Sequence, residues 1–96
     1  MFRVLGNPSH DRPGNKGILQ IREILTSESG AFVSDDLLKL MYRMTKNDVQ
    51  QTVLMALGYI IQRLEILQES DKKSQAKYAE QLAYFQNLLE EQQERQ

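Results

Sequence analysis

The chain has 96 residues and a formal net charge of −1, so it has the length of one folding domain and no general attraction for nucleic acid or an anionic membrane. Hydrophobic residues make up 41% and charged residues 26%, values that exclude the class of chains too polar to fold. Cysteine is absent, which excludes disulfides, thiolate metal sites and thiol nucleophiles.

The sequence contains one histidine, and no spacing of ligands indicates a metal or cofactor site. No apolar run approaches the roughly 20 residues that cross a bilayer, and the first residues do not have the pattern of a signal peptide. We therefore expect a soluble, cytoplasmic protein without a membrane partner and without a cofactor.

Residues 1–17 differ in composition from the remainder of the chain. They contain both prolines and three of the five glycines, a composition that favours turns and extended backbone. We predict a flexible or extended N-terminal arm over 1–17 and one helical domain over 18–96.

The first helix is expected over 18–29. Its apolar residues recur at helical spacing, Asn15 is available as the N-cap, and Gly30 suits the left-handed position that often follows a helix. A second helix is expected over 35–44, because Ser34 is a favourable N-cap and Asp35 and Asp36 lie at the positive end of the helix dipole. The apolar stripe of this second helix is predicted to be Leu37, Leu40, Met41 and Met44, with Leu38 and Tyr42 on its flank.

The third helix is expected over 46–69, beginning within residues 45–48, which resemble a capping box. Apolar residues along it step by four and three residues, which is the spacing of a coiled-coil seam; they are Val53, Leu57, Ile60, Leu64 and Leu67. Met55, Tyr59 and Ile66 fall on the opposite side. A helix that is apolar on two sides should lie at the centre of the protein, with its second side covered by another molecule.

Eight polar residues, 68–75, then interrupt the apolar pattern, which resumes with Tyr78, Leu82, Phe85 and Leu89. We predict a turn followed by a fourth helix over 75–93 that packs antiparallel on the third. The alternative is one unbroken helix, because the segment lacks proline and glycine and the apolar stripe stays nearly in phase across it. The expected fold class is all-α, a four-helix protein with a helical hairpin.

The leading functional hypothesis is a non-enzymatic protein interaction module, an adaptor or a small regulatory or accessory subunit. The apolar residues outside the expected core exceed what a chain of this size readily buries, and tyrosine and methionine are frequent at interfaces. We therefore predict a homodimer, together with an unidentified protein partner. The predicted interface residues are Tyr42, Met55, Gly58, Tyr59, Ile66, Tyr84 and Leu88.

Residues 35–55 support a second hypothesis, a small DNA-binding regulator, because two helices joined by a short corner imitate a helix-turn-helix. Its base-reading residues would be Lys46, Asn47, Gln50 and Gln51. The nearby carboxylates of Asp35, Asp36 and Asp48 would repel phosphate, so nucleic acid is not the partner we favour.

An enzyme is the third hypothesis and the one with least support. His10 and Asp11 are adjacent on a turn-rich arm that would not hold a rigid catalytic geometry. The pair Asp35 and Asp36 is explained by its place at a helix start. We do not expect catalysis, since no nucleophile and base are paired in the pattern.

Overall fold

The computed structural model describes residues 13–95, with side chains from Lys16 onward. Within that range the chain forms helices α1 (Pro13–Leu25), α2 (Asp35–Met44), α3 (Val49–Ser70) and α4 (Gln75–Glu94). Two short 3-10 helices lie between them, η2 (Ser27–Ala31) and η3 (Lys72–Ser74). The predicted all-α, four-helix class is confirmed. Residues 1–12 of the expected arm, including His10 and Asp11, lie outside the described range.

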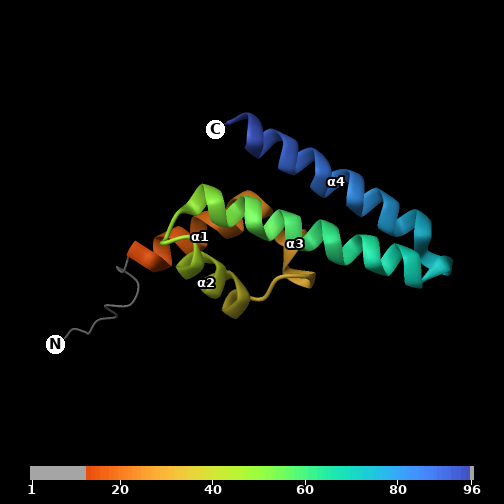
Figure 1. The fold of residues 1–96 in the computed structure, drawn as a ribbon, viewed down its shortest axis with the longest axis horizontal. Coiled ribbons are helices and arrows are strands. Elements are labelled where there is room, and N and C mark those ends of the chain that lie inside the picture. The colour runs from red at the N-terminus through yellow and green to blue at the C-terminus, as the bar shows by residue number, and fades with distance from the viewer. Residues whose placement is uncertain (1–12, 96) are drawn as a thin grey trace.

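Helix α3 is the central element of the fold (Figure 1). Helices α1 and α2 pack against its N-terminal half, and α4 folds back antiparallel along it. The molecule is elongated, with principal extents of 56 × 29 × 19 Å. None of the helices within 13–95 has the length and hydropathy needed to cross a membrane.

Helix α1 begins and ends earlier than predicted. It starts at Pro13, so residues 13–17 are helical and Asn15 lies inside the helix rather than at its N-cap. Proline suits a first helical turn because its fixed φ is helical and its missing N–H would have no partner there. The helix ends at Leu25, where Thr26 takes a φ of 69° and a ψ of 172°, and not at a left-handed Gly30.

Helix α2 has the predicted bounds, and its start has the predicted cap: Leu37 N donates to Ser34 Oγ at 3.2 Å. Its buried face is different from the prediction. Leu38 and Tyr42, which we expected on the flank, are buried, whereas Leu40 and Met44 are 45% and 64% exposed. The buried face of α2 packs against α3 and α1, and α1 approaches so closely at Gly17 that a Cβ there would overlap the ring end of Tyr42.

Helix α3 begins at Val49, three residues later than predicted. Lys46 and Asn47 have φ values of 58° and 64°, which a right-handed helix cannot include. Asp48 is the N-cap, and its carboxylate accepts from Gln51 N at 2.9 Å. Four of the five predicted seam residues are confirmed as core: Val53, Leu57, Ile60 and Leu64 have no exposed surface, whereas Leu67 is half-buried.

The hairpin prediction is confirmed and the unbroken-helix alternative is wrong. Helix α3 continues to Ser70, Asp71 leaves the helical conformation, and α4 begins at Gln75. The helix ends are tied across the turn, since Gln75 Nε2 donates to Gln68 O at 3.2 Å. On α4, Leu82 and Phe85 are buried as predicted, and Phe85 packs edge-on against Phe32, with ring centroids 6.1 Å apart.

Candidate protein interaction surface

Helix α3 presents a second apolar side, opposite to the core. At 100° per residue, Met55, Tyr59 and Ile66 fall within about 40° of one another on the helix. Met55 is 37% exposed and Ile66 is 52% exposed, while Tyr59 is half-buried at the edge of the core. The structure therefore leaves a line of apolar surface along α3 that the rest of the described chain does not cover.

The same side of α3 carries no charge over its first four turns. Residues 49–62 include no Asp, Glu, Lys or Arg, and the polar residues that share this side are the neutral Gln51 and Gln62, both exposed. Gly58 lies between them, also exposed, and a Cβ built on it would meet no atom within 4 Å. We call this surface the outer face of α3; it comprises Gln51, Met55, Gly58, Tyr59, Gln62 and Ile66.

Three other predicted interface residues lie elsewhere. Tyr42 is 8% exposed and belongs to the core, because it packs against α1. Leu88 is half-buried against the core cluster. Tyr84 is 41% exposed, but its hydroxyl lies 2.9 Å from Thr26 Oγ1, so it faces the corner between α1 and η2.

The four residues predicted to read DNA do not form one free surface. Lys46 and Asn47 are exposed but lie in the turn before α3, and Gln51 belongs to the outer face of α3. Gln50 is engaged within the protein, since its Nε2 donates to Gln92 O at 2.7 Å. This bond fastens the end of α4 to the start of α3.

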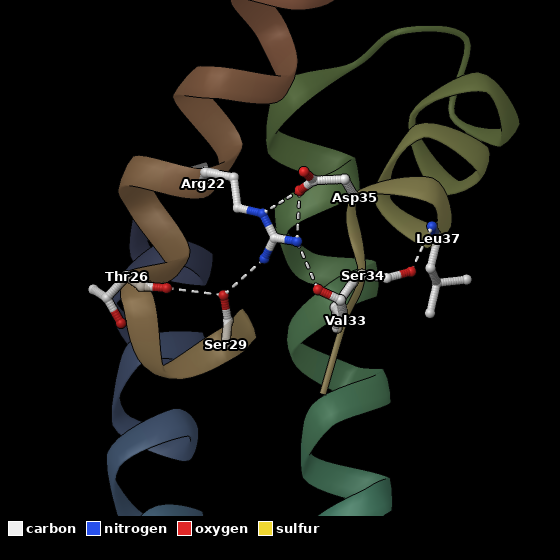
Figure 2. A network of polar contacts seen from close by, with 7 residues as sticks. All are labelled: Arg22, Thr26, Ser29, Val33, Ser34, Asp35 and Leu37. Carbon is white, nitrogen blue, oxygen red and sulfur yellow. Dashed lines mark hydrogen bonds and ion pairs between the residues drawn. The ribbon is translucent and has the colours of Figure 1, made fainter. Parts of the chain in front are cut away.

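The acidic residues of the described range form no metal-binding group. Among residues 13–95 no three His, Cys, Asp or Glu side chains lie close enough together to hold a metal ion. Asp35 is instead part of an arginine network that the sequence pattern did not reveal (Figure 2). Arg22 donates to Asp35 Oδ1 from Nε at 2.9 Å, to Val33 O from Nη2 at 2.6 Å and to Ser29 Oγ from Nη1 at 3.3 Å.

The Arg22 network fastens the connection between α1 and α2. Ser29 is fully buried, and its hydroxyl donates onward to Thr26 O at 2.9 Å. Each of the three guanidinium nitrogens thus donates to an acceptor between Ser29 and Asp35, and Figure 2 shows how the side chain lies across this segment. No periodicity or motif marks such a contact in the sequence, because its partners are seven to thirteen residues away along an irregular path. Its role is structural.

Comparison of the chain with protein-family models, with curated proteins and with solved structures finds no match.

Proposed function

We propose that this protein is a non-enzymatic interaction module that self-associates through the outer face of α3 and serves as an adaptor or a regulatory or accessory subunit. The observation that carries the proposal is an apolar face of the central helix on which Met55 and Ile66 are 37% and 52% exposed and which is uncharged from Val49 to Gln62. We also propose a cytoplasmic location, since a chain without cysteine is suited to a reducing compartment.

A second copy of the chain is the partner that this face fits. A twofold contact places the same patch against itself, so a charge near the twofold axis meets its own copy. From Val49 to Gln62 the outer face avoids that penalty, because this stretch carries no charge; Ile66 lies beyond it, with Glu65 beside it and Glu69 one turn further on. Gly58 has no side chain, so the backbones of two helices can approach closely there, as they do at small residues between packed helices. Two α3–α4 hairpins joined in this way would form a bundle.

The test is the molar mass in solution, measured by light scattering after size exclusion at tens of micromolar protein. We expect the wild-type chain to have twice the mass of the 11.2 kDa monomer. The double variant Met55→Arg/Ile66→Arg should be monomeric, because the arginines of one copy would face the arginines of the other. Its helical circular dichroism spectrum should be unchanged. The matched control is Leu19→Arg, which changes a 64% exposed leucine on α1 and should leave the dimer intact.

Gly58 supplies a second and more specific test. Gly58→Ala should raise the stability of the isolated fold by up to about 1 kcal/mol, since alanine is the better helix former and the site is open. Gly58→Leu should reduce dimer affinity, since its side chain would hold the two backbones apart. A monomeric wild-type protein, or a dimer that tolerates both the double arginine and the leucine variants, would refute the proposal.

A further inference from the structure

The turn between α3 and α4 lacks the local features that usually end one helix and begin another. Residues 68–75 contain no glycine and no proline. The last turn of α3 has no basic residue, the first turn of α4 has no acidic one, and Ser74 makes no side-chain hydrogen bond as the N-cap of α4. Local chemistry therefore does not select this position for a break in the helix.

The interactions that close the turn are exposed to solvent. Gln75 Nε2 donates to Gln68 O at the surface, and the ion pair of Lys72 with Glu69 joins side chains that are 68% and 87% exposed. Such exposed ion pairs contribute little to stability. Only residues 71–74 depart from the α-helical conformation, and three of them form the 3-10 helix η3. In an unbroken helix, the first N–H groups of α4 would gain carbonyl acceptors four residues earlier, which the start of a helix lacks.

Helix α4 is held by its packing along α3, and this packing does not depend on the turn. Phe85 is buried, and Gln50 Nε2 donates to Gln92 O at the far end of the hairpin. The eleven residues from Leu67 to Tyr78 rotate the apolar stripe by only about 20°. The core side of α4 would therefore continue the core side of α3 along one unbroken helix.

From these observations we infer that two copies of the chain exchange α4. In the exchanged dimer, residues 49–94 of each copy form one helix, and α4 packs on the partner copy's α3 with the contacts that it makes within one chain in the closed hairpin. A single chain does not adopt the unbroken helix, because the core side of its α3 would then be uncovered.

Domain swapping of this kind costs little, because the closed and exchanged forms share one interface between α3 and α4. The two forms differ in the conformation of residues 71–74 and in the association of two molecules. The exchange does not use the outer face of α3, so this inference does not rest on the proposed function.

The experiment uses the Met55→Arg/Ile66→Arg variant, in which the proposed contact through the outer face of α3 is blocked. The variant is unfolded in urea and refolded at low micromolar or at millimolar concentration, and the molar mass is then measured by light scattering at one common dilution. We expect a monomer from the dilute sample and a dimer from the concentrated one, because mass action favours exchange and α4 must leave its partner before the dimer can revert. A monomer from both samples would overturn the inference.

Two substitutions at Lys72 test the unbroken helix itself. Lys72→Pro removes a helical N–H and places the proline ring against the preceding turn, so it excludes the unbroken helix. The closed hairpin tolerates this change, because Lys72 is the first residue of η3 and Asp71 before it is already extended, with φ −118° and ψ 88°. The matched control Lys72→Ala loses the same exposed ion pair and should keep the dimer. Equal dimer fractions for the two variants after concentrated refolding would contradict the exchange.

A cross-link identifies which helices meet in the dimer. The chain has no cysteine, so Gln50→Cys and Gln92→Cys, made in separate chains, each introduce a single thiol. In the exchanged dimer, position 50 of one copy lies beside position 92 of the other, and a short bismaleimide should join the two variants after they are refolded together at millimolar concentration. A dimer without this cross-link would mean association through another surface and would exclude the exchange. The proposed function is tested on chains that were never unfolded, so either proposal can fail without the other.

Discussion

The hydroxyl of Tyr84 on α4 lies 2.9 Å from Oγ1 of Thr26, 58 residues earlier, at the corner where α1 ends. Thr26 Oγ1 donates its single proton to Glu28 Oε2 at 2.7 Å, so the Tyr84 hydroxyl is the donor to Thr26. This chain of hydrogen bonds joins α4 to the corner between α1 and η2. It gives the Tyr84 hydroxyl a partner within its own chain, while the residue as a whole stays 41% exposed.

Two substitutions at Thr26 should distinguish how much its hydrogen bonds and its backbone conformation each contribute to stability. Thr26 has a φ of 69°, a region that β-branched residues rarely adopt. Thr26→Val keeps the shape and the strain but loses the hydroxyl, and should lower the free energy of unfolding by about 1 kcal/mol in urea denaturation. Thr26→Ser keeps the hydroxyl and should be at least as stable as wild type. Equal stability of Thr26→Val and Thr26→Ser would show that the hydrogen bonds contribute nothing.

The acid titration of Glu28 should report the same contact. The hydrogen bond from Thr26 is the main cause that holds the pKa of the Glu28 carboxyl below its ordinary value; desolvation opposes it, and the backbone N–H of Glu28 adds a smaller lowering. Because the folded pKa lies below the unfolded one, the associated stability is present above the unfolded pKa and is lost as pH falls through the folded pKa. In an NMR titration, Thr26→Val should raise the pKa of Glu28 toward the ordinary value. An unchanged titration in that variant would contradict the assignment.

Gly17 should be intolerant of any side chain. A Cβ at this position would overlap the hydroxyl and ring end of the buried Tyr42. Although alanine is the better helix former, Gly17→Ala should lower the free energy of unfolding by about 1–3 kcal/mol, because overpacking forces α1 and α2 apart. The matched control is Gly58→Ala, also within a helix, where the site is open and stability should not fall. Thermal melts of both variants provide the comparison.

Arg22 should matter more than its ion-pair partner. Its side chain is 25% exposed and serves Asp35, Val33 and Ser29 at once, whereas the Asp35 side chain is 70% exposed. Arg22→Lys cannot reach three acceptors with one ammonium group and should lower the free energy of unfolding by about 2 kcal/mol. Asp35→Asn should cost less than about 1 kcal/mol, as exposed ion pairs do. A larger loss for Asp35→Asn would mean that the ion pair, and not the capture of Val33 O and Ser29 Oγ, closes the connection.

Much of the helical architecture follows from local chemistry. The second helix was predicted with its observed bounds, because a side-chain cap at Ser34 and two acidic residues after it act within one turn. The seam from Val53 to Leu64 was predicted as core, because α3 is long enough for its period to be unambiguous. The predicted start of α3 is three residues too early. Lys46 and Asn47 have left-handed φ values, and the sequence has no glycine there to indicate them.

The candidate surfaces could be predicted only in part. Met55 and Ile66 are exposed where the helical period places them, opposite the seam. Tyr42 was expected at the surface and is buried, and the Arg22 network had no signal at all, because both depend on how segments distant along the chain approach one another.

The amino-acid sequence by itself determined where the helices α2 and α4 form and which side of α3 is core, because caps, polar breaks and apolar period are local properties. Only the tertiary structure decided which side of α2 is buried. Its apolar residues span about 200° of the helix, so either half could face inward. The half with Leu38, Met41 and Tyr42 packs against α3 and α1, with the ring of Tyr42 close to Gly17, and the half with Leu40 and Met44 is left at the surface.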